Sequence, residues 1–146
     1  MFASQTHELS AAAGANNPFH IGVNVGQQLG ITVIAHASFF QVVTFSGLPT
    51  TNGTVTFSGS GEGVPMQAST GGTSFLVQPQ GDGFLLSVLF QFSPSGPGGP
   101  PQTAVINQLP VPIVIGNDIQ IQVTSEDGAD NDNNDSVATI TITTAS

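Results

Sequence analysis

The sequence has no Lys, Arg, Cys, Trp or Tyr among its 146 residues, although it carries nine Asp and Glu residues. Without basic side chains it has no means of neutralising the phosphates of a nucleic acid, the anionic surface of a membrane or a phosphorylated substrate. The absence of cysteine excludes a disulfide framework, a zinc–thiolate site and a thiol nucleophile. No apolar run approaches the length of a membrane-spanning helix. We therefore expect neither nucleic acid nor membrane insertion.

Catalytic motifs are also missing. The three histidines, His7, His20 and His36, are scattered along the chain, and lone histidines are more often surface or packing residues than ligands. Ser and Asp residues occur, but no G-x-S-x-G elbow marks a nucleophile. A carboxylate pair for glycoside hydrolysis cannot be argued from sequence alone. We expect a protein that is not an enzyme.

Beyond residue 20 the sequence predicts strands, because short β-branched and aromatic runs alternate with Gly, Pro, Asn and Ser. Ile119, Ile121 and Val123 face one side of such a run and the intervening polar residues face the other, which is typical of an antiparallel sheet. About nine short strands separated by turns predict an all-β fold, an antiparallel β-sandwich of Greek-key or jelly-roll type. The candidate strands are residues 31–36, 40–45, 54–58, 74–78, 84–92, 103–107, 111–115, 119–124 and 136–143.

One domain accounts for most of the chain. Residues 20–146 form the predicted sandwich, and residues 1–19 form an extension outside it, either a tail or a strand lent to a neighbouring molecule. The Pro- and Gly-rich segment 94–101 is interpreted as a long hairpin loop, because too few residues follow it to build a second core.

The segment 126–135 holds five of the nine carboxylates. A close pair of carboxylates repels by roughly 1 kcal/mol in water and about 4 kcal/mol near a protein surface, and no basic side chain is present to relieve it. Raised pKa values, full solvation in a loop or a bound cation could each relieve it. Carboxylate and amide oxygens are hard ligands, so the metal would be Ca²⁺. A solvated acidic turn is the alternative.

The spacing Asp130-x-Asp132-x-Asn134-Asp135 places oxygen donors on alternate residues, as a chain wrapping Ca²⁺ requires. It is not an EF-hand, because the sixth position is Asp135 instead of Gly and the twelfth is Thr141 instead of Glu. The flanking runs also predict strands instead of helices. We interpret the segment as a calcium loop between two strands, with enough charge for two adjacent ions.

Residues 125–135, SEDGADNDNND, resemble the signature loop of the LecB-type bacterial lectins, which bind fucose or mannose through two calcium ions. The family reads SEDGTDNDYND there, so only Ala129 and Asn133 differ. A weaker resemblance covers residues 29–38, LGITVIAHAS, which are similar to the family strand FGVTAFANSS that leads into a sugar-specificity loop.

The resemblance implies a role for particular residues. The calcium ligands it implies are Glu126, Asp130, Asp132, Asn134, Asp135 and the backbone carbonyl of His36. The sugar contacts it implies are Asp127, Ala37 and Ser38. Ala37 falls at the first position of the specificity loop, where Ala accompanies a preference for mannose in similar lectins. Two calcium ions can accept vicinal sugar hydroxyls as ligands.

The sequence therefore predicts a calcium-dependent, carbohydrate-binding lectin for mannose- or fucose-type sugars, found outside the cell or on its surface. We expect a homodimer or higher homo-oligomer, because shallow sugar sites gain avidity from multivalency. The alternative is a calcium-stabilised extracellular structural or filament subunit that assembles by strand addition and binds no sugar.

Overall fold

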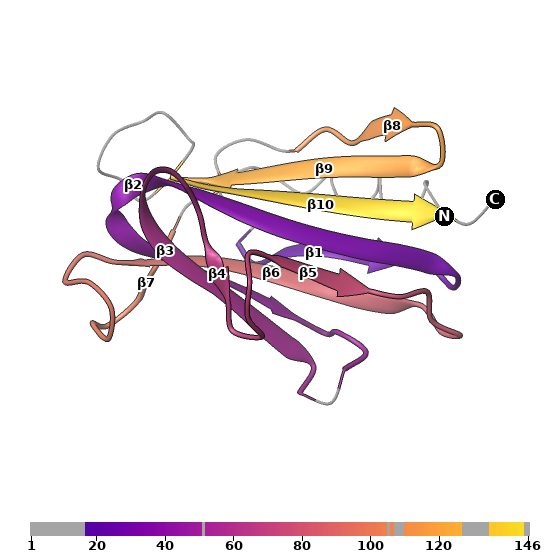
Figure 1. The fold of residues 1–146 in the computed structure, drawn as a ribbon, viewed down its shortest axis with the longest axis horizontal. Coiled ribbons are helices and arrows are strands. Elements are labelled where there is room, and N and C mark those ends of the chain that lie inside the picture. Colours follow the sequence, from indigo (N-terminus) through magenta and orange to yellow (C-terminus); the bar gives the residue numbers. More distant parts are fainter. Residues whose placement is uncertain (1–16, 51, 105, 107–109, 127–134, 145–146) are drawn as a thin grey trace.

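The computed structural model describes residues 17–50, 52–104, 106, 110–126 and 135–144. These residues form ten antiparallel strands in one curled sheet (Figure 1). The predicted all-β antiparallel fold is confirmed. In chain order the strands are β1 (Phe19–Val23), β2 (Gln27–Ser46), β3 (Thr54–Pro65), β4 (Gln67–Ala68), β5 (Ser74–Val77), β6 (Phe84–Ser93), β7 (Gln102–Thr103), β8 (Ile113–Ile115), β9 (Asp118–Ser125) and β10 (Ser136–Thr144).

The long strand β2 organises the sheet. Its first half pairs with β10 on one edge and β5 on the other, and β9 and β8 follow beyond β10. Its second half pairs with β6 and β3, and β1 and β7 lie beyond β6. Between the halves the register against β3 shifts twice, between Ala35 and His36 and between Ala37 and Gln41. Such bulges bend a strand, and β2 turns at the left end of Figure 1. The sheet thereby folds over itself into a β-sandwich.

The core follows from period-two alternation along the strands. On β10, Ala138, Ile140 and Ile142 are buried, whereas the residues between them face outward. The predicted sidedness of β9 is confirmed, since Ile119, Ile121 and Val123 are buried, and Phe90 and Phe92 of β6 are buried as well. On the neighbouring strands β2 and β3 of the second half, the buried rings of Phe45 and Phe57 pack edge to face, with centroids 5.6 Å apart. Together these side chains close a single apolar core.

The N-terminal side of the sandwich extends beyond the expected boundary. Phe19 is buried and begins β1, and the side chain of Asn17 is hydrogen-bonded to β6. Residues 17–19, expected to lie in the extension, therefore pack on the domain, and residues 1–16 lie outside the described part of the chain. Within the described ranges no helix is long and apolar enough to cross a membrane.

Candidate metal centre

The candidate centre lies where β9 ends and β10 begins. Ser125 pairs with Ser136 as the last rung between these strands. Glu126 directly follows β9 and Asp135 directly precedes β10, and each is only 2% exposed. The antiparallel pairing of β9 with β10 places the end of one strand beside the start of the other, so both predicted ligands come to the same end of the sandwich.

The backbone of Asp135 joins three strands at this point. Its N–H donates to the carbonyl of Ser125 over 2.9 Å, and its own carbonyl accepts the N–H of His36, also over 2.9 Å. The bend of β2 is thereby fixed against the ends of β9 and β10. His36, predicted to contribute a backbone carbonyl, lies directly beside Asp135.

The bend carries the residues assigned to sugar contacts, and a buried amide supports it. The side-chain oxygen of Gln41 accepts a 3.0 Å hydrogen bond from the hydroxyl of Ser136, and its side-chain nitrogen donates to the carbonyl of Phe39 over 3.3 Å. Gln41 is completely buried. Ala37 and Ser38 lie on the supported segment, and Ser38 is exposed. The structure therefore presents Ser38 to solvent beside the end of β10.

A residue that sequence reasoning missed lies at the rim of this region. Glu62 on β3 pairs in register with His36, and its Oε2 lies 2.6 Å from Nδ1 of the imidazole. Glu62 is 79% exposed, whereas His36 is 27% exposed. Because the imidazole is engaged with β3, a role for His36 through its backbone alone agrees with this geometry. Only the pairing of β2 with β3 brings the two residues together, and no sequence motif marks it.

The electrostatics of the centre favour a cation. Burial of a carboxylate costs several kcal/mol unless a counter-charge or hydrogen bonds compensate it, and the chain has no Lys or Arg to supply the charge. Beside Glu126 and Asp135, the hydroxyl of Ser125 is buried and has no hydrogen-bond partner among the described residues. Buried orphan oxygens in native proteins are uncommon and can mark an ion site. These oxygen donors fit a hard cation such as Ca²⁺.

Four further predicted residues, Asp127, Asp130, Asp132 and Asn134, lie outside the described residues. Within the described ranges, no three His, Cys, Asp or Glu residues gather as a metal cluster. The full ligand set, the number of ions and the sugar contact of Asp127 therefore stay predictions.

Comparison with solved structures places this fold among bacterial lectins. The chain is similar to a high-affinity mannose-binding lectin of Ralstonia solanacearum, with 24% identity over 84% of this chain and 93% of that one, and a TM-score of 0.54. It is similar to the Chromobacterium violaceum lectin CV2L in complex with alpha-methyl-fucoside, with 21% identity over 90% and 96% of the two chains and a TM-score of 0.57.

A third similar structure is the C-terminal domain of the lectin BC2L-C from Burkholderia cenocepacia. Its identity is 18% over 86% of this chain and 95% of that one, with a TM-score of 0.53. No family model and no curated protein matches the sequence. The sequence resemblance to LecB-type lectins is thus confirmed at the level of the fold.

Proposed function

We propose that this protein is a calcium-dependent lectin that binds mannose- or fucose-type sugars and performs no catalysis. The observation that carries the proposal is the burial of Glu126 and Asp135 at one end of a lectin-like sandwich, in a chain without a basic residue. Of the similar structures, one is described as mannose-binding and another holds a fucoside. The acidic signature between these two residues supports the same ligand class.

The candidate residues have two separate roles, one in binding the metal and one in contacting the sugar. Glu126 and Asp135 would hold the metal, together with Asp130, Asp132 and Asn134 of the acidic segment. When bound, calcium supplies coordination positions that neutral sugar hydroxyls can occupy in place of water. The bend of β2 positions Ala37 and Ser38 beside this end of the sandwich, so that the exposed hydroxyl of Ser38 can select among sugars. A neutral sugar requires no basic side chain, in agreement with the composition.

The proposal also covers where the protein is found and how its copies assemble. Calcium is abundant outside the cell, where modules with 10⁻⁴–10⁻³ M affinity are occupied. We place the protein there or on a cell surface, as a homodimer or higher homo-oligomer whose several sites bind a glycan surface with avidity.

Isothermal titration calorimetry with methyl-α-mannoside and methyl-α-fucoside, in CaCl₂ and in EDTA, tests the proposal. We expect binding in calcium, loss in EDTA and recovery when calcium is restored. Glu126→Gln should abolish binding, whereas Asp82→Asn, which alters an exposed carboxylate in the loop before β6, should not. The absence of binding to either sugar and to a glycan array in saturating calcium would refute the lectin assignment.

The exposed apolar edge strand β8 favours a second candidate function, that of a calcium-stabilised structural subunit assembling by strand addition. Ile113, Val114 and Ile115 are all more than half exposed. Fibres that form with increasing concentration and dissolve in EDTA, together with no sugar binding, would favour this function.

A further inference from the structure

An exposed carboxylate lies at the same end of the sandwich as the candidate metal centre. Glu62 of β3 is 79% exposed and pairs in register with His36. The backbone N–H of His36 donates in turn to the carbonyl of Asp135 over 2.9 Å. A single residue, His36, therefore connects this exposed carboxylate to the buried Asp135 of the centre.

The other solvent-accessible carboxylates of the described ranges lie elsewhere. Asp118 begins β9, whereas the centre follows Ser125 at the end of that strand. Asp82 precedes the start of β6, whereas the end of β6 pairs with Phe40 beside the bend of β2. Among the described residues, Glu62 is therefore the exposed carboxylate that stands beside the proposed sugar contacts.

A bulge in β3 brings Glu62 to this place. Val64 of β3 pairs with Ala35 of β2, and the next pair joins Glu62 to His36. Gly63, with a φ of +69°, is thus an extra residue between the two pairs. In a regular ladder Gly63, which has no side chain, would stand opposite His36. Bulges re-aim side chains and are common beside functional sites, and this one places a carboxylate opposite the bend.

The carboxylate of Glu62 is held in position and still has an oxygen to offer. Its Oε2 accepts a 2.6 Å hydrogen bond from Nδ1 of His36, whereas its Oε1 makes no hydrogen bond within the described part of the chain. The neighbouring pair joins Gly61 to Ala37, so Glu62 stands one pair away from a proposed sugar contact. A side chain that is already fixed loses less conformational entropy when it binds a ligand.

A carboxylate fixed at this place discriminates between sugars by their charge. It attracts an ammonium group and repels another carboxylate, and the chain has no Lys or Arg that could offset it. A neutral sugar experiences neither effect. Because vicinal ring hydroxyls can supply the oxygen ligands of calcium, the C6 substituent of a mannoside can carry a charge without removing those ligands.

We propose that Glu62 determines the charge class of the sugars that this protein accepts. It favours glycans that carry an ammonium group, such as amino sugars, and disfavours acidic glycans, such as those that contain uronic acids. The inference rests on the proposed lectin function and adds to it a specificity-determining residue and a ligand class.

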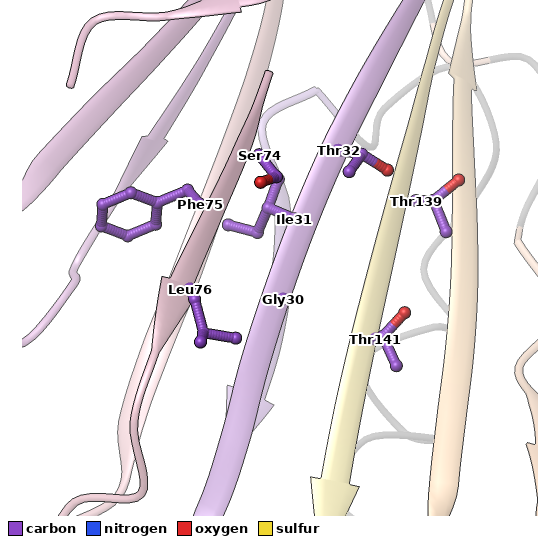
Figure 2. A pocket seen from close by; sticks show the side chains of 8 residues that line it. All are labelled: Gly30, Ile31, Thr32, Ser74, Phe75, Leu76, Thr139 and Thr141. Carbon is purple, nitrogen blue, oxygen red and sulfur yellow. The ribbon is translucent and has the colours of Figure 1, made fainter. Parts of the chain in front are cut away.

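A groove on the outer face of the sandwich does not offer the same selection. This groove, of about 280 Å³, lies over Gly30, between β5 and the Thr139 and Thr141 side chains of β10 (Figure 2). Its lining residues carry no charge. Thr139 is four residues from Asp135, which is about 13 Å along an extended strand. A charged group on a sugar at the metal centre therefore meets Glu62 and not this groove.

Isothermal titration calorimetry of the full chain in CaCl₂ tests the proposal with methyl-α-mannoside, its 6-amino-6-deoxy derivative and its uronic acid. These ligands share their ring hydroxyls and differ in the charge at C6. Exposed ion pairs are weak, so we expect the ammonium form to bind about threefold more tightly than the neutral sugar and the uronate about threefold more weakly. Raising NaCl to about 1 M, where the Debye length is about 3 Å, should abolish both differences.

Variants of Glu62 distinguish a selective role from a structural one. Within each variant, the two charged sugars are compared with the neutral mannoside, so that a change in the site as a whole cancels. Glu62→Gln should remove the preference for the ammonium form, and Glu62→Lys should reverse it. Asp82→Asn, which removes an exposed carboxylate before the start of β6, should preserve it. Circular dichroism checks that each variant is folded.

The outcomes separate this inference from the lectin function on which it rests. If the neutral mannoside binds but the preference is absent, or survives Glu62→Gln, the role of Glu62 is refuted and the lectin function stands. Binding of the ammonium form that persists in EDTA would place that sugar away from the metal centre and would also refute this role. If none of the sugars binds in calcium, both proposals fail.

Discussion

The hydroxyl of Ser136 donates a buried 3.0 Å hydrogen bond to the side-chain oxygen of Gln41, 95 residues away in sequence. This bond connects the first residue of β10 to the strand that leaves the bend of β2. Because Asp135 and Ser38 are close neighbours of its two ends, the bond couples the candidate metal centre to the segment proposed to contact sugar.

Gln41→Met should therefore destabilise the fold by about 1–3 kcal/mol, because it keeps most of the side-chain volume but leaves the buried Ser136 hydroxyl without its acceptor. Urea unfolding measures the change. Gln120→Met, on the outer face of β9, should change stability by less than about 0.5 kcal/mol. If Ser136→Ala is added to Gln41→Met, the further loss should be small, since the bond is already gone. Additive losses would show that the bond is not the cause.

Asn17 should be a strong stabiliser although it lies before the first strand. Its side-chain nitrogen donates to the carbonyls of Phe90 and Ala104, over 2.8 and 2.7 Å, and its side-chain oxygen accepts the N–H of Phe90 over 3.0 Å. Asn17→Ala removes partners from three backbone groups, so we expect a loss of about 2–4 kcal/mol in the free energy of unfolding. Gln80→Ala, which removes one exposed bond to the carbonyl of Gln78, serves as the control. Equal effects of the two substitutions would contradict this role.

The sequence predicts those parts of the fold that depend on local pattern. The alternation of Ile119, Ile121 and Val123 is sufficient to identify β9 and its buried side, because period-two burial is a local property of a strand. The acidic segment is found for the same reason, since its charge and spacing are contiguous. Burial of Glu126 and Asp135 at adjoining strand ends agrees with the predicted loop between two strands.

Long-range pairing accounts for what the sequence did not predict. The predicted strands 31–36 and 40–45 are parts of one strand, β2, because the first half pairs with β10 and the second with β6. The strand β1 was not predicted, because the alternation of Phe19, Ile21 and Val23 spans only five residues and their burial depends on pairing with β6. The proximity of Glu62 to the site likewise depends on the register between two strands.

Two glycines with the same backbone conformation should respond differently to alanine. Gly26 and Gly47 have φ values of +79° and +78°, so each substitution carries a conformational cost of about 1–2 kcal/mol. A Cβ at Gly47 would also collide with the carbonyl oxygen of Leu85, whereas a Cβ at Gly26 meets no atom within 4 Å. Thermal unfolding should show Gly47→Ala to be the more damaging by at least about 2 kcal/mol. Similar losses would mean that the β2–β3 turn and β6 separate at little cost.

Replacing Glu126 by Gln should lower the melting temperature relative to the natural chain in calcium and raise it in EDTA. In the natural chain, calcium binding to the folded state raises the free energy of unfolding, by about 2.7 kcal/mol when the free metal is 100 times its dissociation constant. The variant loses a charged oxygen ligand, so its melting temperature should rise little on addition of calcium.

In EDTA the order of stability should reverse, because the uncharged amide avoids the cost of a buried carboxylate in a chain that has no Lys or Arg. Differential scanning calorimetry of both proteins in CaCl₂ and in EDTA measures all four melting temperatures, and Asp82→Asn controls for the loss of one exposed negative charge. A merely structural role for Glu126 predicts the same destabilisation in both buffers, and that result would exclude it as a calcium ligand. If the variant melts below the natural chain in CaCl₂ but above it in EDTA, a cation interacts with this carboxylate in the folded state.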